Sequence, residues 1–138
     1  MNDHNLSVIL SWIEKADHDL GSAKIIFLHI PEYVDTIAFH CQQAVEKYIK
    51  AALIYFEIDF KKTHDLPYLL DLLSCKTQID TEAYEKAILL NGFGVALRYP
   101  NEIIPLSEAE IRNAISISEE FRDIMLKKMS IDNDIKTG

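Results

Sequence analysis

The chain has 138 residues and a net charge of −8, and hydrophobic residues make up 49% of it, which is typical of one globular domain. This negative charge excludes a protein that attracts nucleic acid through its overall charge, so a phosphate-binding site requires a local cluster of basic residues. The four glycines and four prolines are too few for many turns and favour long helices over short strands.

The first two predicted helices are long and amphipathic. Apolar residues at spacings of three and four predict a helix from Val8 to His29, with Ser7 as its N-cap and Pro31 ending it. The same spacing predicts a second helix from residue 35 or 36 to residue 56. Its predicted buried side comprises Ile37, Cys41, Ala44, Val45, Tyr48, Ala52 and Phe56. Its predicted polar side comprises His40, Gln43, Glu46, Lys47 and Lys50.

A shorter third helix follows a polar loop. It is predicted for residues 65–75, with Thr63 or His64 near its start and Pro67 in its first turn. A histidine at such a position is either a capping or packing residue or a general base. Both interpretations of His64 remain open at this point.

Two more helices complete the predicted fold. The fourth, from residue 80 or 81 to residue 97, is apolar on nearly every side, as in a helix that is central or lies at a subunit interface. The fifth begins with a capping box of Ser107 and Glu110 and continues to Met129. The sequence therefore predicts an all-α, antiparallel up-and-down bundle of four long helices plus one short helix. We expect a single domain over residues 1–130 and a frayed C-terminal tail over 131–138.

Polar side chains on apolar helix faces are the candidate site residues. Asp19 lies at the edge of the apolar stripe of the first helix, either as an exposed charge at the rim or as the partner of a cation in a pocket. Arg98 projects onto the helix face that carries Asn91, so it is predicted either to form a structural salt bridge, with Asp19 for example, or to bind an anion. Lys47 and Lys50 belong either to a solvated face or to an anion site.

Other functional classes find no support in the chain. There is no glycine-rich phosphate loop, no zinc-binding His-Glu-x-x-His pattern and no serine in a nucleophile elbow. No metal or cofactor is therefore expected. Cys41 and Cys75 lack metal-ligand spacing, and no secretion signal or membrane-spanning run is present, so we expect reduced thiols in a cytoplasmic protein.

Four sequence segments together resemble the HEPN family of helical domains over residues 9–125. They are Trp12-Ile13-Glu14-Lys15-Ala16 with Asp19-Leu20, the segment CQQAVEKYIKA at residues 41–51, Thr63-His64-Asp65-Leu66, and Leu97-Arg98-Tyr99-Pro100. The resemblance implies a four- or five-helix bundle that usually dimerises and is paired with a small nucleotidyltransferase, often as a toxin–antitoxin pair. Some family members bind nucleotides, and others are metal-independent ribonucleases.

The catalytic pattern of the ribonuclease members is incomplete in this chain. Those members carry an arginine followed after four to six residues by a histidine. Arg98 aligns with the arginine, but the required places are occupied by Ile103, Ile104 and Pro105. The sequence therefore favours a protein that is not an enzyme of this kind, and Arg98 and a distant His64 remain the catalytic candidates.

Three functional hypotheses follow. The first is a HEPN-like homodimer, partner of a nucleotidyltransferase, that binds a nucleotide or an RNA phosphate. Its predicted ligand-binding residues are Arg98, Lys47, Lys50, Asn91, Asp19 and Tyr99. The second is a ribonuclease toxin that uses Arg98 and His64. The third is a purely structural partner that has no ligand and docks through its apolar fourth helix.

Overall fold

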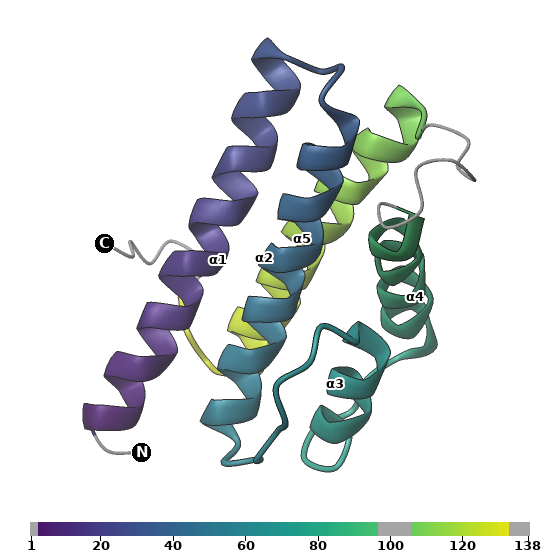
Figure 1. The fold of residues 1–138 in the computed structure, drawn as a ribbon. Coiled ribbons are helices and arrows are strands. Elements are labelled where there is room, and N and C mark those ends of the chain that lie inside the picture. Colours follow the sequence, from purple (N-terminus) through teal and green to yellow (C-terminus); the bar gives the residue numbers. More distant parts are fainter. Residues whose placement is uncertain (1–2, 97–105, 133–138) are drawn as a thin grey trace.

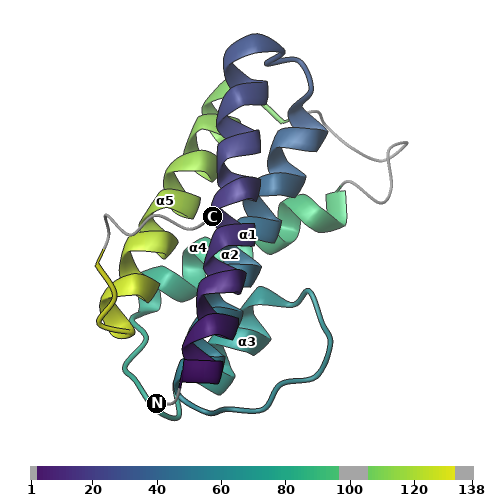
Figure 2. The same cartoon turned by 90° about the vertical axis from the view of Figure 1, so that its left-hand side faces the viewer.

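The computed structural model describes residues 3–96 and 106–132. Within these residues the chain forms five helices, joined by loops, and no strand. The helices are α1 (Asp3–His29), α2 (Val34–Tyr55), α3 (Leu66–Leu73), α4 (Thr81–Ala96) and α5 (Glu108–Lys128). The long helices α1, α2 and α5 run side by side, and α3 and α4 lie on the other side of α2 from α1 (Figure 1; Figure 2 shows α1 in front). The predicted all-α bundle is confirmed. No helix of the described part is both long and apolar enough to cross a membrane.

The helix ends follow local capping signals, with one correction at α1. This helix begins at Asp3, so Ser7 lies inside it and the prediction of Ser7 as N-cap is wrong. The first residues contain no proline or glycine, and one serine inside a helix costs little, so the helix extends past it. The loop after α1 contains Pro31, as predicted.

Asp65 and Asp80 act as caps that the sequence analysis did not single out. The Asp65 side chain accepts a hydrogen bond from the Tyr68 N–H at 3.2 Å, so α3 is capped by Asp65 and not by Thr63 or His64. Asp80 Oδ1 accepts from the backbone of Ala83 at 2.8 Å at the start of α4. At α5 the predicted capping box is confirmed.

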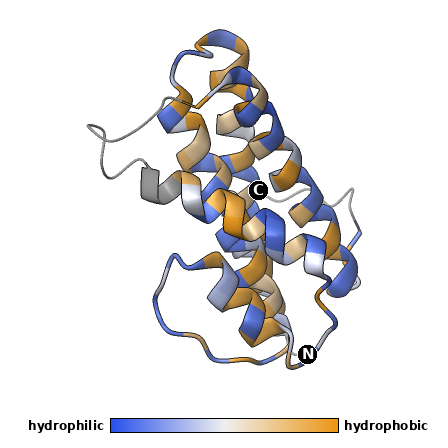
Figure 3. Cartoon of the chain, turned by 90° about the vertical axis from the view of Figure 1, so that its right-hand side faces the viewer, coloured by the Kyte–Doolittle hydropathy of each residue, from blue (hydrophilic) through white to orange (hydrophobic). Residues whose placement is uncertain are grey.

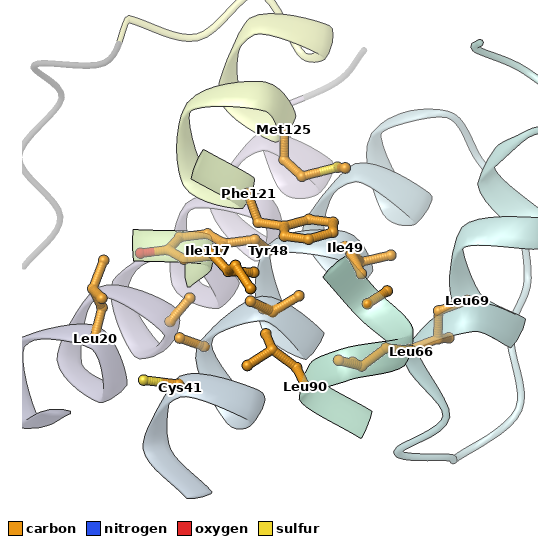
Figure 4. Close-up of a cluster of buried hydrophobic side chains, with 14 of the residues drawn as sticks. Leu20, Cys41, Tyr48, Ile49, Leu66, Leu69, Leu90, Ile117, Phe121 and Met125 are labelled. Atoms are coloured by element: carbon orange, nitrogen blue, oxygen red, sulfur yellow. The ribbon is translucent and has the colours of Figure 1, made fainter. Parts of the chain in front are cut away.

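Helix α2 lies at the centre of the hydrophobic core. It packs on every other helix, most extensively on the antiparallel α1. Figure 4 shows residues from all five helices meeting around it. The core side chains labelled there include Leu20, Tyr48, Ile49, Leu66, Leu69, Leu90, Ile117 and Phe121. Since neighbours surround α2, even polar residues on its predicted solvated side are withdrawn from water.

Helix α4 buries one stripe and exposes another. Ala83, Ala87 and Leu90 are buried, whereas Ile88 is 58% exposed. The buried stripe is therefore not the one that includes Ile88 and Asn91. On the side that carries α3 and α4, hydrophobic and hydrophilic residues are interspersed (Figure 3).

Candidate functional site

Asp19 of α1 is bound by two side chains of α2. His40 Nδ1 lies 2.9 Å from Asp19 Oδ1, and Lys47 Nζ donates to Asp19 Oδ2. All three side chains are largely but not completely buried. The interpretation of Asp19 as an exposed rim charge is therefore wrong, because its carboxylate is paired with Lys47 and His40.

A second carboxylate, Glu46 on α2, is bound in the same way. Lys50 Nζ donates to Glu46 Oε2 at 3.0 Å, and His64 Nδ1 lies 2.7 Å from Glu46 Oε1. The side chains of Glu46 and Lys50 are only 4% and 7% exposed, whereas His64 is 58% exposed. The pair Glu46–Lys50 is thus a buried ion pair and not part of a solvated helix face.

Two aromatic rings surround the buried ammonium group of Lys50. Its Nζ lies 5.8 Å from the ring centre of Trp12 and 5.7 Å from that of Phe60, which are distances for cation–π attraction. Trp12 and Asp19 are seven residues apart on α1, and both face α2. The two carboxylate clusters therefore lie along one seam between α1 and α2. We call this seam, made by Asp19, His40, Glu46, Lys47, Lys50 and His64, the polar seam.

Asn91 of α4 secures the loop that carries His64. Its Oδ1 accepts a hydrogen bond from the backbone N–H of Leu66 at 3.2 Å, two residues after His64. Asn91 thus positions the entrance of α3. Its contact with the chain two residues after His64 makes it a support for the candidate site.

Two predicted site residues lie outside the described residues. These are Arg98 and Tyr99. The structure brings together the other predicted residues. Asp19 contacts Lys47, and Glu46 joins Lys50 to His64, whereas Asn91 contacts Leu66 at the start of α3.

His40 and Glu46 belong to the seam although the sequence analysis assigned them no role. The available signal was the seven-residue spacing of His40 and Lys47, which puts both on one face of α2. Only the packing of α1 on that face showed that Asp19 lies opposite them. For Glu46 the sequence showed the favourable spacing to Lys50 but not the loop that returns His64 to it.

A separate polar cluster joins α1, α2 and α5. Tyr48 donates to Asp17 Oδ1 at 2.5 Å, and Arg122 Nε donates to the same oxygen at 2.9 Å. Burial, together with the hydrogen bond to Asp17, raises the pKa of Tyr48. Burial alone lowers the pKa of Arg122, but the Asp17 carboxylate outweighs it and leaves a net increase. These groups neutralise each other inside the bundle, so their arrangement is structural.

A groove of about 570 Å³ between the end of α1 and the start of α5 includes no residue of the polar seam. It is lined by Lys24, Phe27, Arg112 and their neighbours. Among the described residues, no group of three or more histidine, cysteine or acidic side chains is arranged to hold a metal ion. Both cysteines are free thiols, as predicted, with Cys41 buried and Cys75 exposed.

Comparison with known proteins identifies the family. The HEPN domain family model matches residues 9–129, so the chain belongs to the HEPN family. No curated protein matches the chain.

Three solved structures share the fold. An archaeal HEPN homologue, ST0689, has 21% sequence identity and a TM-score of 0.71, and the match covers 88% of this chain and 97% of that one. The protein TT1696 from Thermus thermophilus has 20% identity and a TM-score of 0.73, with coverage of 87% and 97%. A HEPN domain protein, TM0613, from Thermotoga maritima has 22% identity and a TM-score of 0.69, with coverage of 87% and 98%.

Proposed function

We propose that this HEPN domain protein binds the phosphate groups of a nucleotide or an RNA at the polar seam, as one component of a nucleotidyltransferase/HEPN pair of the toxin–antitoxin type. The observation that carries the proposal is that carboxylates hold in place two nitrogen-bearing side chains, of which one is exposed and the other is partly exposed. His64 is 58% exposed, and Lys47 is 22% exposed. Because each is already oriented, little conformational entropy is lost when a ligand binds.

The charges of the seam set the strength of such a site. With neutral histidines, two lysines balance two carboxylates, so the seam by itself has no net charge. Lys47 uses one donor on Asp19 and keeps others for a phosphate, while Lys50 is too deeply buried to reach a ligand directly. The exposed Lys61 and Lys62 precede His64 on the same loop and add positive charge near His64. Arg98 supplies the remaining positive charge in this proposal.

Binding measurements test this proposal. Purified protein is titrated with ATP and with a fluorescent single-stranded RNA at low salt, by calorimetry and anisotropy respectively. Two variants are compared with the wild type: the single variant Arg98→Ala, and the double variant Lys47→Ala with His64→Ala. Each is expected to weaken binding at least about tenfold, since a charge-assisted hydrogen bond contributes roughly 1.5–3 kcal/mol. The control is Lys24→Ala, which removes an exposed lysine paired with Glu119 at the other end of α1. Equal affinity of all variants contradicts the proposal.

A second candidate function is RNA cleavage with His64 as the proton-transferring residue. The contact of 2.7 Å between Glu46 and His64 favours it, because a carboxylate behind an imidazole is a common arrangement in acid–base catalysis. Arg98 stabilises the charge on the phosphate in this mechanism. Purified protein then degrades RNA in the presence of EDTA, and its expression arrests growth. If His64→Ala leaves both effects unchanged, His64 has no such role.

Exposed apolar side chains support the proposed protein partners. Ile88 and Leu89 are exposed on α4, and Ile25 and Leu28 are exposed near the end of α1. Such groups commonly lie at interfaces when they are gathered in patches. The expected partners are a second copy of this chain and a small nucleotidyltransferase. Size-exclusion chromatography with light scattering tests the first, with Ile88→Lys and Leu28→Lys as variants, and co-purification with a neighbouring nucleotidyltransferase tests the second.

A further inference from the structure

The ionisation of Glu46 is determined by the buried ammonium group of Lys50. Its carboxylate is almost inaccessible to water, an environment that by itself favours the neutral acid. Lys50 lies 3.0 Å away, is equally buried and has its ammonium group against Trp12 and Phe60. A buried ammonium without a counter-charge is strongly unfavourable, so the pair remains charged and Glu46 is a carboxylate.

An ionised carboxylate can only accept hydrogen bonds, which determines the proton position on His64. The nitrogen that lies 2.7 Å from Glu46 Oε1 is Nδ1. Nδ1 must therefore donate, so a neutral His64 ring carries its proton on Nδ1 and has its lone pair on Nε2. This is the less abundant tautomer of a free imidazole, and it makes Nε2 the basic nitrogen of a ring that is 58% exposed.

The same logic applies to His40. Its Nδ1 is the nitrogen at Asp19, and Lys47 holds Asp19 as a carboxylate. The same arrangement therefore occurs twice in the polar seam. In each case a lysine keeps a carboxylate ionised, and the carboxylate orients a histidine through Nδ1. The ring of His40 is 25% exposed, so His64 is the more accessible of the two.

We infer that Glu46 and Lys50 are positioning residues that hold His64 as the Nδ1–H tautomer, so that its Nε2 is the proton acceptor offered to a hydroxyl group of a bound RNA. The tautomer is a property of the free protein, whereas its use in cleavage rests on the second candidate function, RNA cleavage with His64. In that reaction the ribose 2′-hydroxyl gives its proton to Nε2 as O2′ bonds to phosphorus. The P–O5′ bond breaks, and the 5′-oxygen takes a proton from water. The proton held on His64 then neutralises the hydroxide left behind.

Nitrogen NMR of the free protein tests the tautomer directly. Long-range ¹H–¹⁵N correlation spectra of the full chain are recorded near pH 8.5, above the ordinary titration range of histidine. His64 and His40 are expected to show a protonated Nδ1 and an unprotonated Nε2. The exposed His18 and His29 serve as internal controls, because the closest approach of His18 to Glu14 is 4.0 Å, too long for a hydrogen bond. They are expected to show the mixture of a free imidazole, in which the Nε2–H form dominates.

A double variant removes the positioning residues without leaving a buried charge. In Glu46→Met with Lys50→Met, both members of the ion pair are replaced by apolar side chains of similar length, a change that proteins often tolerate. His64 then reverts to the mixture seen for His18. The control double variant, Glu119→Met with Lys24→Met, removes an exposed ion pair elsewhere and leaves His64 unchanged. A wild-type His64 with its proton on Nε2, or a tautomer that persists in the first double variant, overturns the inference.

The functional consequence is measured in the RNA cleavage assay. The Glu46/Lys50 double variant is expected to lose at least about tenfold in kcat, since proton transfer by a positioned side chain contributes roughly 10²–10⁴-fold. The affinity for a non-cleavable 2′-deoxy oligonucleotide should change much less. An unchanged kcat in a variant whose tautomer has reverted overturns the role of Glu46. Wild-type protein that cleaves no RNA refutes the cleavage function alone, because the NMR result still decides the tautomer.

Discussion

Arg122 and Asp17 are joined across 105 residues of sequence. Arg122 Nε donates to Asp17 Oδ1 at 2.9 Å, and Nη2 approaches Oδ2 at 3.4 Å. Because Asp17 lies on α1 and Arg122 on α5, this ion pair joins the first helix to the last. Tyr48 of α2 donates to the same carboxylate, so one acidic group ties the three long helices together.

Asp17→Ala is expected to destabilise the fold by about 2–3 kcal/mol. The variant removes the carboxylate that accepts hydrogen bonds from Arg122 and from the buried hydroxyl of Tyr48, and the loss of a charged acceptor shared by two such donors is costly. Urea unfolding followed by circular dichroism measures the change. The control, Lys24→Ala, breaks the exposed pair with Glu119 and is expected to cost at most about 0.5 kcal/mol. Equal effects of the two variants contradict the structural role of Asp17.

Two neighbouring leucines test the orientation of α4. Leu90 is fully buried, whereas Leu89 is 41% exposed. Leu90→Ala is expected to cost about 2–4 kcal/mol, through lost burial and the cavity that remains. Leu89→Ala is expected to stay within about 0.5 kcal/mol of the wild type. Thermal and urea unfolding of both variants make the comparison, and a larger effect at residue 89 means that α4 is rotated.

The Glu46–Lys50 pair makes a non-additive prediction. Glu46→Ala leaves the buried ammonium group of Lys50 without its carboxylate partner and is expected to destabilise the protein by about 3–5 kcal/mol. Adding Lys50→Met to Glu46→Met removes both charges, so this double variant is expected to be more stable than Glu46→Ala by about 2 kcal/mol or more. A double-mutant cycle in urea, completed with Glu46→Met and Lys50→Met singly, measures the coupling. Additive effects imply that the two groups do not form the buried pair.

Alkaline pH is expected to destabilise the fold through Cys41. Burial raises the pKa of this thiol from 9.0 to about 11, so the folded state retains a proton that the unfolded state loses. The stabilisation is complete below pH 9 and is lost as the pH rises towards 11. A shift of two pKa units corresponds to about 3 kcal/mol.

The measurement is the free energy of unfolding at pH 8 and pH 10.5, for wild type and for Cys41→Ala. The wild type should lose more stability than the variant over this window, and parallel losses contradict the assignment to Cys41. Thiol labelling at pH 8 gives a second readout. A thiol reagent is expected to modify the exposed Cys75 in the native protein and to reach Cys41 only after unfolding.

The fold was accessible from the sequence because helices are local structures. Apolar residues at helical spacing predicted α2 to within about two residues at each end, and the capping box of Ser107 and Glu110 located the start of α5. The one clear error at a helix end, Ser7, arose because a good capping residue is also tolerated inside a helix. Asp19 and Asn91 were singled out in the sequence as polar residues on apolar stripes, and Lys47 and Lys50 as cations on the polar side of the second helix. Each makes a polar contact in the structure.

The partners of those residues were decided by tertiary structure. Lys47 and Lys50 differ by only three positions on one helix, yet one binds Asp19 from α1 and the other is buried with Glu46 beneath His64. Periodicity along one helix gives the direction of a side chain but not what a neighbouring helix places opposite it. The sequence by itself therefore determined the helices, the family and the candidate side chains. The packing of α1 and of the loop before α3 on α2 decided that the carboxylates contact both histidines, with Nδ1 of His40 turned to Asp19 and Nδ1 of His64 turned to Glu46.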